Sequence, residues 1–168
     1  MKVRITDIGP RGLKVNDNIP LEPLNARMNL SRNNDIVFTT SPAADLLVHQ
    51  TPFGAQVKGS VKASYKQPCS LCILELDRDT EVEIDYVFQR RNPVPINKSS
   101  KSKHDDIEEE DLEDDVGICY FQGEHIELEE LLQESLILSI DQYYRPKEDE
   151  KGDCSVCGKK CAKALTVF

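Results

Sequence analysis

Cysteines are the residues of this 168-residue sequence best placed to do chemistry, because four of the six recur at metal-binding spacing. Cys69 and Cys72 form one C-x2-C pair, and Cys154 and Cys157 form a second. A C-x2-C turn lets two thiolates reach one ion, whereas zinc takes four ligands in a tetrahedron. Each pair is half of a site. We predict that folding joins the halves around a structural zinc ion.

The surroundings of the second pair agree with this prediction. In "DCSVCGKKC", Gly158 follows Cys157, where the backbone needs a positive φ to aim its last amide at sulfur. The 81 residues between the pairs exceed zinc-ribbon spacing, so the fold has to bring the pairs together. Cys161 is a spare thiol that could replace a ligand. Cys119 stands alone on an apolar run, and we expect it in the core.

Three other interpretations of the cysteines remain open. An iron–sulfur centre also accepts four cysteines. Reduced thiols that hold no metal are the second alternative. A thioredoxin-like redox pair is the third, but such a pair lies where a strand enters a helix, and Cys69 and Cys72 lie between two expected strands.

No other constellation in the sequence suggests catalysis. His49, His104 and His125 are scattered, no glycine-rich phosphate loop follows a strand, and no serine stands in a nucleophile-elbow motif. We therefore predict that the protein is not an enzyme.

Two strands are expected to carry the first cysteine pair. Both "VKGSVKASYK" before it and "TEVEIDYVFQRR" after it alternate apolar and polar residues, which predicts a hairpin with one buried face. The favoured register sets lysines against acids, with Lys66 opposite Glu81 and Lys62 opposite Asp85. The lysines also suggest a basic stripe for RNA phosphates, which these cross-strand acids would partly offset.

The remaining elements complete an α+β fold. Strands are expected in "MKVRITDI", "DIVFTT", "ADLLVHQ" and "VGICYFQG", with a turn at "TPFG" and a short helix after Pro23. One strong helix is predicted over residues 125–140, its apolar face including Leu128, Leu132 and Leu138. The predicted architecture is an antiparallel sheet, open or barrel-like, with one main helix and a cysteine knuckle.

The net negative charge comes from one segment. The formal net charge is -9, yet residues 105–115 carry nine acids and no base, and the remaining 21 acids match the 21 bases. Blocks of like charge repel and stay solvated. We predict a single domain over residues 1–168 with a disordered acidic loop at 92–115.

Location follows from what the chain does not contain. "MKVRITDIGP" has no apolar run typical of a signal peptide, and no stretch of 18 apolar residues could span a membrane. We expect a cytoplasmic protein without a membrane partner. Thiols stay reduced in that compartment, which favours a metal over disulfides.

The order of these elements resembles the bacterial YceD family, whose members support the accumulation of large-subunit ribosomal RNA. The match is carried by residues 57–72, 81–88, 126–140 and 154–158. The resemblance implies a ribosome-biogenesis factor for accumulation or processing of large-subunit (23S) ribosomal RNA. Its implied partners are that RNA, a large-subunit ribosomal protein, or both.

Two functions of other classes remain. One is a protein-interaction adaptor that binds a basic partner through the acidic loop at 92–115. The other is a thiol oxidoreductase, which needs a cysteine of low pKa.

Overall fold

The computed structural model describes residues 1–30, 35–70, 73–91, 118–144, 146–147, 149–151, 153–156 and 158. The described residues form a mixed α+β fold, as predicted. In chain order the elements are β1 (Lys2–Arg4), a 3-10 turn (Ile5–Asp7), β2 (Leu13–Asn18), α1 (Leu21–Met28), β3 (Val37–Phe38), β4 (Ala43–Thr51), β5 (Gly54–Pro68), β6 (Glu75–Arg90), β7 (Ile118–Phe121), β8 (His125–Glu127) and α2 (Glu129–Ser139).

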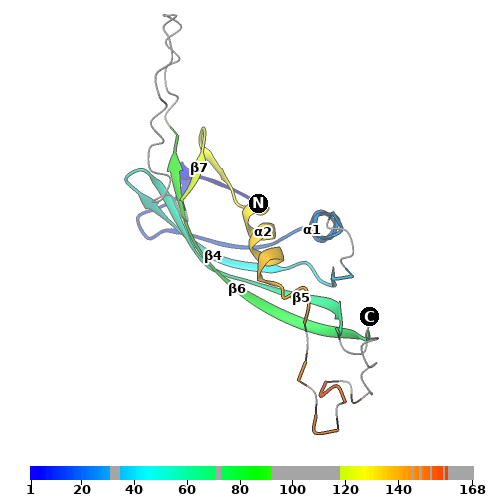
Figure 1. Cartoon of the computed structure of the whole chain (residues 1–168). Helices are drawn as coiled ribbons and strands as arrows, with labels where there is room; N and C mark the ends of the chain where they lie inside the picture. The colour runs from blue at the N-terminus through cyan, green and yellow to red at the C-terminus, as the bar shows by residue number, and fades with distance from the viewer. Residues whose placement is uncertain are drawn as a thin grey trace, which may run out of the picture.

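The main sheet is open and mostly antiparallel. Its strand order is β2-β4-β5-β6-β7, with β3 also paired to β5, and a separate two-stranded sheet joins β1 to β8. The short strand β7 runs parallel to β6. Both helices lie on the concave face of the curved sheet (Figure 1), where a barrel would have its interior. The barrel-like alternative is therefore wrong for the described residues, whereas the one main helix and the short helix expected after Pro23 are both present, as α2 and α1.

The long hairpin of β5 and β6 has the predicted faces but a different register. Val57, Val61 and Tyr65 are buried on one face of β5, as their alternation predicts. Lys62 faces Glu81 and Lys66 faces Asp77, so the predicted register is wrong by four residues. A shift of four residues keeps every side chain on its face and still sets lysines against acids. The observed register has the shorter connection, which costs less loop-closure entropy.

The turn at "TPFG" is confirmed, since β4 ends at Thr51 and β5 begins at Gly54. A side chain at Gly54 would meet the backbone of β6, because a Cβ there would lie 2.0 Å from the carbonyl oxygen of Phe88. Glycine therefore permits the close approach of the two strands at this end of the hairpin.

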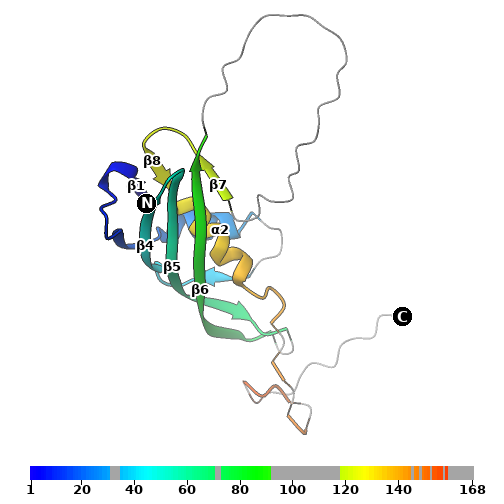
Figure 2. The ribbon, with the colours of Figure 1, turned by 90° about the vertical axis from the view of Figure 1, so that its left-hand side faces the viewer.

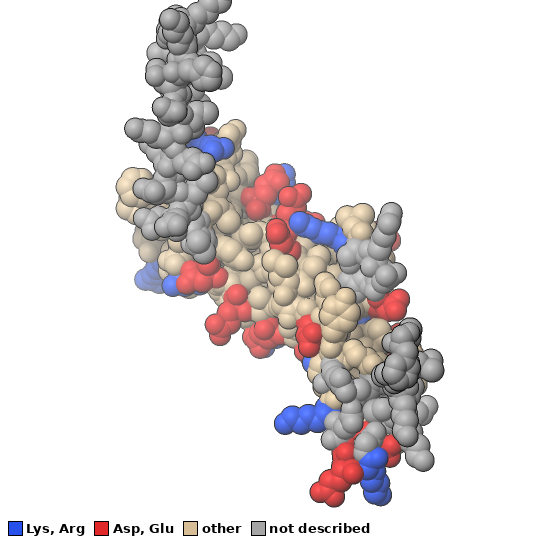
Figure 3. Space-filling view, in the orientation of Figure 1, with Lys and Arg blue, Asp and Glu red and all other residues tan. Residues whose placement is uncertain are grey.

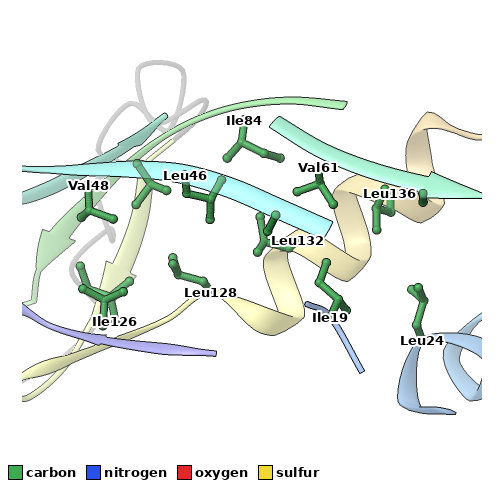
Figure 4. Close-up of a cluster of buried hydrophobic side chains, with 14 of the residues drawn as sticks. Ile19, Leu24, Leu46, Val48, Val61, Ile84, Ile126, Leu128, Leu132 and Leu136 are labelled. Carbon is green, nitrogen blue, oxygen red and sulfur yellow. The ribbon is translucent and has the colours of Figure 1, made fainter. Parts of the chain in front are cut away.

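Helix α2 is shorter than the predicted helix over residues 125–140. His125–Glu127 instead forms β8, which pairs with β1, so the helix begins only at Glu129. Leu128, Leu132 and Leu136 are fully buried, and Figure 4 shows them beneath Leu46, Val61 and Ile84 of the sheet. Leu138, expected on the apolar face, is 76% exposed.

Helix α1 supports the other end of this core. It begins one turn earlier than expected, at Leu21, and Pro23 lies within its first turn, where a backbone N–H has no helical partner. Leu24 and Met28 are buried, and the Asn25 side chain pairs with both backbone groups of Phe38 in β3. These contacts hold α1 against the same core as α2.

Two further predictions concern the acidic loop and the absence of a membrane-spanning segment. The acidic loop at 92–115 lies outside the described residues. No helix in the described ranges is long and apolar enough to cross a membrane.

Candidate metal centre

The first cysteines of the two C-x2-C pairs lie side by side. The Sγ atoms of Cys69 and Cys154 are 3.8 Å apart, although the residues are 85 positions apart in the chain. Both side chains are buried. A disulfide bond would require the two sulfur atoms to lie about 2.05 Å apart. Two thiolates bound tetrahedrally to one zinc, each at about 2.3 Å, lie about 3.8 Å apart. The observed separation thus fits two corners of a zinc tetrahedron.

The residues that close the two cysteine turns share one backbone conformation and one hydrogen bond. Ile73, which follows Cys72, has a φ of +62°, and Gly158, which follows Cys157, has a φ of +64°. Each donates its N–H to the carbonyl oxygen four residues earlier, that of Cys69 or Cys154, at 2.8 Å. The positive φ expected at Gly158 is confirmed. The same turn at Ile73 was not predicted, because β-branched residues rarely adopt this conformation.

Three contacts hold the C-terminal segment against the far end of the hairpin. The Arg78 guanidinium stacks 3.6 Å from the centre of the Tyr144 ring. The backbone N–H of Ser70 donates to the carbonyl oxygen of Tyr144 at 3.2 Å, and the Gln67 amide donates to that of Asp141. Figure 2 shows the segment that follows α2 passing this end of the hairpin. The chain that leads to Cys154 thus reaches this end of the hairpin through contacts that do not involve sulfur.

The other predicted ligands lie outside the described residues. These are Cys72, Cys157 and the spare Cys161. Among the residues that the structure does describe, no three histidine, cysteine or acidic side chains are grouped to hold a metal. The zinc site and the cysteine knuckle therefore remain predictions, and the sulfur pair of Cys69 and Cys154 is the observation that bears on them.

Cys119 lies apart from this site. It stands on β7, which pairs with β6 at Val87–Arg90, whereas Cys69 adjoins the opposite end of β6. Its side chain is partly buried against the core, as predicted, and this burial raises the pKa of the thiol. A raised pKa favours the protonated thiol, which is a weak metal ligand.

The expected basic stripe on β5 is paired with acids of β6. Lys58 lies 3.1 Å from Asp85, and Lys62 lies 3.4 Å from Glu81. Lys66 lies 2.9 Å from Glu75, and this bond raises the pKa of the lysine. The pairing leaves little free positive charge on this face for nucleic acid.

Arginine and aromatic side chains meet at the other end of β6, a feature that the sequence analysis missed. The guanidinium of Arg91 lies 5.5 Å from the centre of the Tyr120 ring, and that of Arg90 lies 6.0 Å from the centre of the Phe121 ring. Phe53 is 75% exposed beside them, in the lining of a surface cavity of about 490 Å³ that includes Arg90. Neither arginine forms an ion pair with another described residue. The residues belong to separate strands and a turn, so no local motif marked them.

Comparison with protein families gives a match. A family model described as "Large ribosomal RNA subunit accumulation protein YceD" matches residues 57–164. That range takes in nearly all of the β5–β6 hairpin, all of α2 and both cysteine pairs. Comparison with curated proteins and with solved structures gave no match.

Proposed function

The chain belongs to the YceD family, and from this we propose that it supports the accumulation of large-subunit ribosomal RNA in the cytoplasm without catalysing a reaction. The observation that carries the proposal is the family match over residues 57–164, which covers most of the chain.

We further propose that Cys69, Cys72, Cys154 and Cys157 hold a structural zinc ion. The 3.8 Å separation of two of the sulfurs and the matched turns at Ile73 and Gly158 support it. When bound, the ion would supply a cross-link between the hairpin and the C-terminal segment. Such a link stabilises folding because it restricts the unfolded chain across a long loop.

The end of the sheet that carries Arg90, Arg91 and Phe53 is the surface best suited to direct contact with RNA. Arginine guanidinium groups bind phosphates, and exposed rings stack on unpaired bases. The lysines of β5 are poorer candidates because acids of β6 already pair with them. The surface therefore favours single-stranded RNA bound at the arginine end.

Binding measurements separate these two surfaces. The Arg90→Ala, Arg91→Ala variant should bind fragments of large-subunit ribosomal RNA more weakly. Its affinity should also depend less steeply on salt concentration, by the equivalent of about one to two phosphate contacts. The matched control is Lys58→Ala, Lys62→Ala, which removes the same charge and should bind like the original chain. Equal losses in both variants would reject the assignment to the arginine end.

The role itself is tested in the cell. Depletion of the protein should lower large-subunit ribosomal RNA relative to small-subunit ribosomal RNA, and re-expression should restore the ratio. An unchanged ratio after depletion would reject the proposed function.

The second candidate function is an adaptor that binds a basic partner through the acidic loop at 92–115. The nine acids of residues 105–115, with no base among them, favour it. An adaptor of this kind should bind basic proteins but no ribosomal RNA fragment, and removal of residues 105–115 should abolish that binding.

A further inference from the structure

Strand β6 leaves a long hydrogen-bonding edge without a partner in the described part of the chain. It pairs with β5 along its whole length, but β7 pairs with its other edge only at Val87–Arg90. The rest of that edge, residues 75–86, is longer than a typical strand of five or six residues. In Figure 2, β6 is the last long strand on its side of the sheet. An exposed edge of this length is a template for another strand.

Two hydrogen bonds show which residues point their backbone groups to this edge. The N–H of Arg90 donates to Phe53 on the β5 side, whereas the N–H of Arg91 donates to Phe121 on the β7 side. The pairing with β5 continues without a bulge from Gln89 to Glu75. Backbone groups alternate in direction along a strand, so the odd-numbered residues of β6 offer their N–H and C=O groups to the open edge.

Every odd-numbered residue along this edge is acidic and exposed. They are Glu75, Asp77, Asp79, Glu81, Glu83 and Asp85. Figure 3 shows acidic side chains following the border of the molecule where β6 runs in Figure 1. The same residues therefore offer both hydrogen-bonding backbone groups and negative charge.

The lysines of β5 balance only half of these acids. Glu75, Glu81 and Asp85 form ion pairs, and Asp79 accepts a hydrogen bond from Ser64. Within the described ranges, Asp77 and Glu83 form no ion pair. Negative charge thus remains beside the open backbone groups.

We propose that the open edge of β6 binds an extended, lysine- or arginine-rich segment of a partner protein, which adds to the sheet as one more strand. In an added strand, the residues that bond to the odd-numbered residues of β6 place their side chains on the acidic face. The residues between them face the half-buried Leu76 and Val82. The segment that fits therefore alternates basic and apolar or β-branched residues.

Charge argues against the other occupants of the edge. A second copy of this chain would set acids of one β6 against acids of the other, and like charges directly opposite destabilise a strand pair. Nucleic acid would be repelled by the same carboxylates. This partner is separate from the RNA contact proposed above, which lies at the arginine end of β6. Either interaction can fail without the other.

The test uses the full chain and a synthetic twelve-residue peptide that alternates lysine with valine or threonine. The peptide should bind, and it should slow hydrogen exchange at the amides of Asp77, Asp79 and Glu81. Amides of even-numbered β6 residues, which already bond to β5, should change little. A peptide of the same charge with proline at alternate positions lacks the required N–H groups and should not protect these amides.

Two matched variants test the charge selection. Asp77→Asn, Glu83→Gln removes two carboxylates without disturbing an ion pair of the described residues, and it should weaken peptide binding roughly fivefold. Glu22→Gln, Asp35→Asn makes the same change of charge near α1 and should weaken it less than twofold.

Four outcomes would overturn the proposal. They are no binding at low salt, equal amide protection by the proline peptide, equal effects of the two variants, and edge-to-edge dimers of the chain itself in sedimentation. RNA binding measured on the same variants reports separately on the proposed function.

Discussion

Ile73 and Gly158 hold equivalent places in the two cysteine turns, with φ values of +62° and +64° and the same 2.8 Å hydrogen bond to the first cysteine. Glycine adopts this conformation freely, whereas a β-branched side chain is strained there. The Ile73 side chain is 78% exposed, so its removal loses little packing. We predict that Ile73→Gly stabilises the protein by roughly 0.5–1 kcal/mol, the relief of strain less the added entropy of the unfolded chain.

Urea unfolding checks this value, and Ile73→Ala is its control. Alanine loses the β-branch but keeps the Cβ, so it should stabilise the protein by clearly less than glycine does. Equal stabilisation by alanine and glycine would show that the exposed side chain, and not the backbone, is the cause.

The ion pairs of the β5–β6 hairpin give a second prediction. Lys62 lies opposite Glu81, and both side chains are more than half exposed. Lys62→Glu should destabilise the protein by up to about 1 kcal/mol, and Lys62→Glu with Glu81→Lys should recover part of the loss. Lys62→Glu with Asp85→Lys should recover less, because Asp85 lies opposite Lys58. Chemical unfolding of the four chains measures the difference. Equal recovery by both pairs would contradict the register.

The hairpin shows what the sequence could and could not predict. Alternation along β5 and β6 predicted both faces correctly, because a strand has a period of two. Any shift by an even number of residues keeps the faces, and the acids at every second position from Glu75 to Asp85 keep most lysines of β5 opposite an acid. The observed register differs in having a shorter connection between Pro68 and Glu75, which the cysteine turn fills, and in placing Lys58 opposite Asp85.

Helix α2 supplies a third prediction. Leu132 is fully buried beneath the sheet, whereas Leu138 on the same helix is 76% exposed. Leu132→Ala should cost about 2–5 kcal/mol, since it removes buried surface and leaves a cavity. Leu138→Ala should change the free energy of unfolding by less than about 0.5 kcal/mol. Thermal or urea unfolding compares the two, and similar losses would contradict the placement of the helix.

Long-range pairing limited what could be predicted of this helix. The helical period correctly identified its core, Leu128 and Leu132. The sequence did not reveal that His125–Glu127 pairs with β1, because that partner lies more than 120 residues away. The cysteine site has the same limit. Spacing identified two half-sites, but only the fold brings the sulfurs of Cys69 and Cys154 together.

A fourth prediction concerns the pKa of the Asp85 carboxyl. A hydrogen bond from Gln56 and one from Lys58 lower the pKa of this carboxyl below its ordinary value of 3.8. A lowered pKa means that the carboxylate adds stability above pH 3.8, and that this contribution is lost as the pH falls through the folded value. Gln56→Ala and Lys58→Ala should each raise the pKa of Asp85, because each removes a hydrogen bond to the carboxylate. Carboxyl NMR titration measures both, and no change in either variant would contradict the geometry.

The central claim is that this protein, through its cysteine pairs, supports the accumulation of large-subunit ribosomal RNA. The most direct test is the ratio of large- to small-subunit ribosomal RNA in cells depleted of the protein. The original chain and a Cys119→Ser variant should restore the ratio, since Cys119 lies apart from the candidate metal centre. Cys69→Ser with Cys154→Ser should not restore it at equal expression, because it removes both sulfurs that lie 3.8 Å apart. Restoration by this double variant would contradict the role of the cysteines, and failure of the original chain would contradict the proposed function.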